Sequence, residues 1–280
     1  MSGVTGDSNV LYGQPDHFSK EMKELINSPN YSDVKFYVGE DRTLFTGHKC
    51  LLSTRCEVFK AVFDAPVGDP EAPLILADIR PKIFHTVLEY IYTNSATITT
   101  DGVCDLLAAA VEFSLDGLKK LCNQFMRDYC DKDLVCEFLQ AGICHSQDHI
   151  VTHCIQFIEE YTEDVFSSVK FKEISEHALR CVLQSDRLRI DEAKLIGYVK
   201  EWAHINAVVT GESMETVATN VIQFIRLPIL DGETLSRIEY ENESLHYIPL
   251  SMIAYAWKCH ALKLSNPKDP LLRHRNPPDN

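Results

Sequence analysis

One short stretch of the chain has the alternating apolar pattern of β-strands, whereas nearly every periodic segment after residue 81 has helical spacing. Val34, Phe36 and Val38 alternate with more polar neighbours, and a Gly-Glu-Asp turn at residues 39–41 leads to the β-prone residues 43–46. These two runs predict a hairpin, and the apolar run at residues 74–76 predicts a third strand. We therefore expect a small sheet flanked by helices, followed by an all-α part.

The predicted elements divide the chain into four parts. A short amphipathic helix opens the α+β domain, residues 15–130, and precedes the hairpin. A string of helical patterns makes residues 131–262 an all-α domain. Residues 1–14 form a polar leader without periodicity, and the proline-rich residues 263–280 likewise lack it, so we expect both ends to be flexible.

The charge of the chain excludes two classes of partner. Its 280 residues contain 27 Lys plus Arg against 41 Asp plus Glu, a formal charge of −14 that repels a phosphate backbone or an anionic bilayer. We therefore expect neither nucleic-acid nor membrane binding. The N-terminus has no secretory pattern, which predicts a cytoplasmic and/or nuclear protein, and the ten cysteines, which include no CxxC, are then expected to be reduced.

No motif of a known catalytic or cofactor-binding site is recognisable, so we expect no enzyme activity, no catalytic residue and no cofactor. Two alternatives remain. His145, His149 and His153 repeat every four residues and would offer ligands to zinc, although the pattern favours histidines at the edge of a core. Cys50 and Cys56 follow cationic residues that would lower a thiol pKa, although burial in the core is the favoured interpretation.

Six separated segments resemble a known family. In chain order, they are Tyr31-Ser32-Asp33-Val34, Gly47-His48-Lys49-Cys50-Leu51-Leu52, Phe59-Lys60-Ala61-Val62-Phe63, Phe84 through Thr93, Leu183-Gln184-Ser185-Asp186, and Phe224 through Leu230. The first four resemble a BTB/POZ domain, and the last two, with Trp202, resemble a BACK domain. The resemblance covers about residues 15–260 and is to family members without kelch repeats.

The resemblance implies an interaction module that forms a dimer with itself or with another BTB protein. The family's first helix packs across a two-fold axis, so Phe18, Met22 and Leu25 are dimer candidates, and Asp33 and Lys49 match charged positions near that interface. An isolated amphipathic helix also needs a partner for its apolar face on general grounds. Packing within its own chain is the alternative.

The resemblance also implies contact with Cullin-3, a ubiquitin-ligase scaffold. Family members commonly use an apolar residue, any residue and then an acid, placed after the helix that here contains Phe63. The candidate Cullin-3 contacts are therefore Phe63 of that helix and the matching positions Val67 and Asp69, which Gly68 separates. Here an aspartate replaces the commoner glutamate, and prolines bracket the motif, so its reach differs from the family's pattern.

These features together predict a non-enzymatic, dimeric BTB-BACK adaptor that links an unknown protein substrate to a Cullin-3 ubiquitin ligase. The substrate would be recruited through the helical half or the tail. The alternative is a BTB dimerisation scaffold or transcriptional co-regulator without ligase function.

Overall fold

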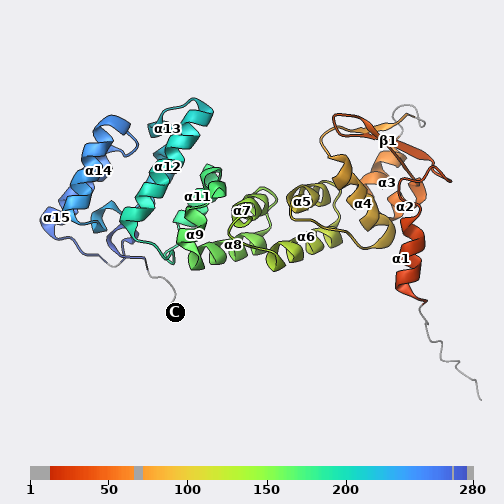
Figure 1. Cartoon of the computed structure of the whole chain (residues 1–280), viewed down its shortest axis with the longest axis horizontal. Coiled ribbons are helices and arrows are strands. Elements are labelled where there is room, and N and C mark those ends of the chain that lie inside the picture. Colours follow the sequence, from red (N-terminus) through yellow and green to blue (C-terminus); the bar gives the residue numbers. More distant parts are fainter. Residues whose placement is uncertain (1–12, 66–71, 267, 276–280) are drawn as a thin grey trace, which may run out of the picture. The chain divides into compact units, whose positions relative to one another are not determined.

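The computed structural model describes residues 13–65, 72–266 and 268–275, and the chain divides into two compact units, residues 1–125 and 126–280. The first unit holds a small sheet and helices (Figure 1). Its elements are α1 (Pro15–Lys23), β1 (Val34–Val38), β2 (Thr43–Gly47), α2 (Lys49–Arg55), α3 (Glu57–Asp64), β3 (Leu74–Leu76), α4 (Pro81–Thr93), α5 (Val103–Glu112) and α6 (Asp116–Asp128), of which α6 runs into the second unit.

The sheet has the strand order β2-β1-β3. β1 and β2 pair as the predicted antiparallel hairpin, with Phe36 opposite Phe45, and β3 pairs with β1 in parallel. Gly39 begins the hairpin turn with a φ of 74°, a conformation that glycine adopts without steric cost. The α+β class expected for this unit is confirmed.

Aromatic side chains fill the core of this unit. Phe36 from the central strand is fully buried and lies 5.2 Å, between ring centroids, from Phe84 of α4. Phe59 of α3 stacks on Phe113 with centroids 4.9 Å apart, and Phe36 meets Phe59 edge to face. This cluster joins the sheet to the helices that carry the candidate site.

The sequence pattern predicts one helix over residues 51–63, but the structure has two. The chain becomes extended at Cys56, with φ −141° and ψ 111°, and α3 starts at the next residue. Cys56 is buried, and its thiol donates to the carbonyl oxygen of Phe113 at 3.4 Å. The break therefore occurs at a buried residue.

The second unit is helical throughout its described residues (Figure 1). Its elements are α7 (Val135–Cys144), α8 (Asp148–Glu160), α9 (Thr162–Phe166), α10 (Val169–Lys172), α11 (Glu176–Leu183), α12 (Glu192–Thr210), α13 (Met214–Ile222), η1 (Leu227–Ile229), α14 (Gly232–Leu245), α15 (Leu250–Leu262) and η2 (Pro270–Leu272). The 19-residue α12 supplies the buried Trp202, whose indole N–H donates to the carbonyl of Ile174 at 2.8 Å. The expected all-α second part is confirmed.

The described end of the chain differs from the flexible tail expected from residue 263. Residues 261–266 are exposed, but η2 and the residues after it return to the helical unit. Arg275 is buried, with 7% of its surface exposed. The proline-rich composition without apolar periodicity gives no sign of this contact, because charged side chains make most of it.

Within the described residues, no helix combines the length and apolar character that a membrane crossing requires.

Candidate protein-interaction site

A groove of about 430 Å³ lies between α1, α2 and α4 of the first unit. Its walls are mainly apolar: α1 contributes Phe18 and Met22, α2 contributes Leu51, and α4 contributes Ile91 and Tyr92. Phe18 leaves 62% of its surface exposed beside this groove, and Met22 is half-buried. The groove and the exposed ring together form an apolar surface open to a partner.

α1 begins at Pro15. Pro15, at the first helical turn, follows Gln14, whose side chain makes no capping hydrogen bond. No residue of α1 is fully buried. Leu25, the third apolar candidate, follows the end of the helix and is half-buried. The structure thus brings Phe18 and Met22 to the groove but not Leu25.

One ion pair attaches α1 to the body of the unit. Lys23 at the end of α1 donates to the carboxylate of Glu89, which is buried on α4 and also accepts hydrogen bonds from the backbone N–H and the hydroxyl of Thr97, at 3.0 and 3.1 Å. Burial opposes ionisation of Glu89, but the hydrogen bonds from Lys23 and Thr97 outweigh it and lower the pKa of the carboxyl group. Glu89 therefore holds α1 in place as a charged acceptor.

His48 and Tyr92 form the polar part of the site next to the groove. The Tyr92 hydroxyl lies 2.9 Å from Nδ1 of His48 and accepts the His48 backbone N–H at 3.0 Å, while Nε2 of His48 lies 2.9 Å from the carbonyl oxygen of Asn30. Burial raises the pKa of Tyr92 to about 12, against a smaller opposing effect of the His48 hydrogen bond. Tyr92 therefore stays neutral and fixes the start of α2.

Asp33 and Lys49 lie together, as the sequence match suggests. A carboxylate oxygen of exposed Asp33 accepts the backbone N–H of Lys49 at 2.7 Å, at the first residue of α2. The Lys49 ammonium lies 5.9 Å from the ring centroid of Phe63. The Asp33 carboxylate thus connects the residue before β1 to the start of α2, and the Lys49 side chain connects the start of α2 to the end of α3.

Phe63, the first of the predicted Cullin-3 contacts, is half-buried near the end of α3 and stacks on Phe59 with ring centroids 6.0 Å apart. The other two, Val67 and Asp69, lie outside the described residues. Val62 beside Phe63 is 42% exposed. The last turn of α3 therefore presents an apolar surface at the residues that precede the predicted motif.

The histidines of the zinc alternative do not share a helix. His145 follows the last residue of α7, whereas His149 and His153 belong to α8. Over residues 13–65, 72–266 and 268–275, no three His, Cys, Asp or Glu side chains gather in a way that would hold a metal ion.

The two cysteines of the redox alternative differ in their surroundings. Cys50 is exposed, while Cys56 is buried, and desolvation raises the pKa of its thiol rather than lowering it as the neighbouring arginine suggested.

Sequence reasoning missed Glu89, His48 and Tyr92 as positioning residues, although all three lie within segments that carry the family resemblance. A charged residue inside the apolar stripe of α4 is the signal that would have singled out Glu89, since a buried carboxylate requires partners. Its partners, Lys23 and Thr97, lie 66 and 8 residues away in sequence.

Comparisons with known proteins agree with this architecture. The BTB/POZ domain model matches residues 22–129, and the model described as "BTB And C-terminal Kelch" matches residues 135–239. The chain is 42% identical over 255 residues to "BTB/POZ domain-containing protein 19" of Homo sapiens, covering 91% of this chain and 88% of the relative. The Bos taurus protein of the same name is 41% identical over the same shares.

Matches of lower sequence identity cover smaller shares of this chain. "BTB/POZ domain-containing protein 9" of Drosophila melanogaster is 26% identical over 80% of this chain and 30% of its own length. Among solved structures, the "BTB domain of zebrafish PATZ1" is 23% identical and covers 43% of this chain and 99% of its own, with a TM-score of 0.34. Because two family models match successive parts of the sequence and a relative of 42% identity spans nearly all of it, the chain belongs to the BTB/POZ-BACK family.

Proposed function

We propose that this member of a protein-interaction family is a dimeric, non-enzymatic adaptor that links a protein substrate to a Cullin-3 ubiquitin ligase in the cytoplasm or nucleus. The observation that carries the proposal is the exposed Phe18 beside the apolar groove of α1, α2 and α4. A large aromatic side chain that is 62% exposed next to a hydrophobic groove is costly to leave in water and is typical of an interface.

A second copy of this chain is the partner that we propose for the groove. The groove and the projecting ring lie on the same surface of one unit, so a two-fold axis would bring each Phe18 to the partner's copy of the groove. In such an isologous contact Asp33 and Lys49 would lie near the interface, as the family resemblance implies. Dimerisation with another BTB protein uses the same surface.

The Cullin-3 part of the proposal rests on family membership and on the end of α3. Phe63 and Val62 present apolar surface there, and the sequence continues to Val67 and Asp69 in the order that the family's Cullin-3 contact uses. In such a contact the apolar side chain of Val67 would fill a cleft of the partner, and the carboxylate of Asp69 would accept hydrogen bonds at the rim of that cleft.

Calorimetry with the N-terminal half of Cullin-3 tests the ligase role. We expect the full chain to bind with a Kd at or below about 1 μM, about 8 kcal/mol. Val67→Ala combined with Asp69→Ala should abolish the heat, whereas Asp41→Ala, an exposed acid in the hairpin turn, should leave it unchanged. No heat from a chain shown to be a folded dimer would contradict the ligase role and leave a dimerisation scaffold.

A further inference from the structure

The end of the described chain inserts an arginine into the helical unit. The Arg275 and Glu192 side chains are 3% and 4% exposed, and Nε of Arg275 donates to one carboxylate oxygen of Glu192 at 3.0 Å while Nη2 donates to the other at 3.2 Å. The two residues are 83 positions apart, and Glu192 opens α12. This is a buried, bidentate ion pair.

Three backbone carbonyls complete the arginine site, which we define as Glu192 with the carbonyls of Leu183, Ser185 and Phe224. Nη1 of Arg275 donates to Leu183 at 2.9 Å and to Ser185, and Nη2 donates to Phe224 at 3.1 Å. All five N–H groups of the guanidinium therefore have acceptors. Leu183 is the last residue of α11, where the helix dipole favours a cation. A lysine ammonium cannot reproduce this planar set of donors.

A second arginine of the tail binds beside the first. Arg273 pairs with the carboxylate of Asp186, which also accepts from the buried Arg226, and Nη1 of Arg226 donates to the Arg273 carbonyl at 2.9 Å. Burial opposes ionisation of Asp186, but the two guanidinium groups outweigh it and lower the pKa of the carboxyl group.

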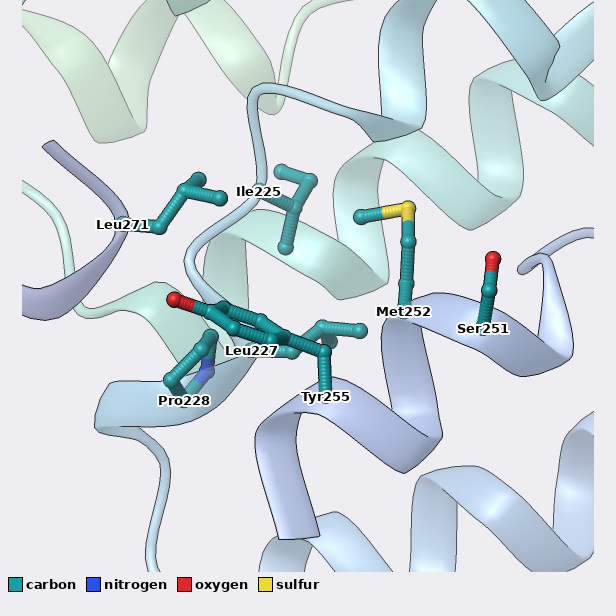
Figure 2. Close-up of a pocket in the computed structure, with 7 residues that line it drawn as sticks. All are labelled: Ile225, Leu227, Pro228, Ser251, Met252, Tyr255 and Leu271. Carbon is teal, nitrogen blue, oxygen red and sulfur yellow. The ribbon is translucent and has the colours of Figure 1, made fainter. Parts of the chain in front are cut away.

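Leu271 supplies the apolar part of the contact. Figure 2 shows its side chain beside a small cavity of about 140 Å³ with Ile225, Met252 and Tyr255. The Tyr255 hydroxyl also donates to the carboxylate of Asp269 at 3.3 Å. The three anchoring residues, 271, 273 and 275, are every second residue of the segment. Leu271 lies in the 3-10 turn η2, and the chain becomes extended at Arg273, with φ −121° and ψ 149°. The segment thus presents one apolar and two cationic side chains to the unit, as a short peptide does to a receptor.

A short exposed link joins the tail to the rest of the unit. Residues 263–266 are exposed between α15 and the contact. A cavity of about 480 Å³ is lined on one side by Asp269, Pro270 and Leu271 and on the other by the body of the unit. The tail thus contacts the unit through a few side chains and does not pack closely along its length, unlike a core element.

We propose that the arginine site, with Asp186, is a binding site for a Leu-x-Arg-x-Arg segment, and that the chain's own residues 271–275 occupy it reversibly. Release of the tail exposes two carboxylates and an apolar cavity at the same place. The site is independent of dimerisation and of Cullin-3 binding, so it stands whether or not the proposed function does.

A cleavable full-length chain tests this proposal. A protease recognition sequence is inserted between Leu264 and Ser265, in the exposed link, and the folded protein is cut. We expect the released tail to stay bound at about 10 μM protein and to be displaced by excess synthetic peptide of residues 265–280. The body should keep its circular dichroism spectrum after displacement. The same peptide carrying Arg273→Ala and Arg275→Ala should compete at least about 100-fold less well.

Four outcomes would overturn the proposal. They are loss of the tail on cutting, no displacement by excess peptide, equal displacement by the peptide without arginines, and unfolding of the body once the tail is gone. The last outcome would make residues 268–275 an integral part of the fold instead of a ligand. Calorimetry with Cullin-3 on the same cut protein reports the proposed function separately.

Discussion

At the scale of single residues, Arg275 shows how much depends on one buried charge pair. Removing two ions from water costs several kcal/mol for each, and here five hydrogen bonds to the guanidinium offset that cost. Deleting one partner leaves the Glu192 carboxylate facing only backbone groups. The pair is therefore much more sensitive to substitution than the exposed ion pairs on the surface of the helices.

We predict that Arg275→Ala lowers the free energy of unfolding of the helical unit by about 3 kcal/mol. The two tryptophans of the chain, Trp202 and Trp257, both lie in this unit, so their fluorescence during urea unfolding reports on it alone. His274→Ala, at the exposed neighbouring position, should change the value by less than about 0.5 kcal/mol. Equal unfolding midpoints for Arg275→Ala and the unaltered chain would contradict the assigned contact.

Glu89 predicts a pH dependence for the docking of α1. Its pKa is lowered in the folded state from an ordinary value of 4.5, so its contribution to stability is complete above that value and is lost as the pH falls through the folded-state pKa. Glu89→Gln should cost about 1 to 2 kcal/mol at pH 7 and progressively less below pH 4.5. Hydrogen exchange of the α1 amides measures the loss of stability at pH 7 and its decrease at lower pH. A loss of stability that is the same at every pH would contradict the role of the Glu89 charge.

At the scale of secondary-structure elements, α1 is attached to its unit at one end and open to solvent at the other. Lys23 fixes its last turn to Glu89, while Phe18, more than a turn earlier, is exposed beside the groove. A helix held in this way keeps its apolar side chains in position before any partner binds. Such pre-organisation reduces the entropy lost when an interface forms.

We predict that Phe18→Asp weakens dimerisation by at least about 30-fold, because loss of a central aromatic side chain typically costs 2 kcal/mol or more. The ring is 62% exposed, so the substitution should leave the fold of the unit intact. Sedimentation equilibrium gives the dissociation constants, with Lys20→Ala, exposed and on another face of α1, as the matched control. An unchanged dissociation constant would exclude α1 from the dimer interface.

The elements that the sequence predicts best are those with a regular apolar period. The hairpin and the third strand follow from alternation at residues 34–46 and 74–76, and the structure confirms both. The break between α2 and α3 could not be predicted in the same way. Residues 51–63 keep a helical period across Cys56, and the contact that its thiol makes there is with Phe113, 57 positions later in the sequence.

At the scale of the whole molecule, the candidate sites also differ in how far a local sequence pattern predicts them. Phe18 and Met22, named as dimer candidates from the family resemblance and from the amphipathic pattern, both line the groove, and their place in a dimer interface stays a prediction. The arginine site could not be predicted, because its acceptors come from residues 183–192 and 224 and its donor from residue 275. No local pattern links segments so far apart when charged side chains make most of the contact.

The proposed function predicts an assembly with more than one copy of each component. If each subunit of the proposed dimer binds one Cullin-3, the complex contains two copies of both proteins. Such an assembly presents two substrate-binding surfaces to one ligase complex, which strengthens binding through a high effective concentration.

The mass of the full chain, measured by light scattering alone and with the N-terminal half of Cullin-3, tests the adaptor account most directly. We predict twice the chain mass of 31.8 kDa for the protein alone and a complex of two chains with two Cullin-3 fragments in the mixture. A particle of 31.8 kDa that does not change mass when Cullin-3 is added would contradict the account.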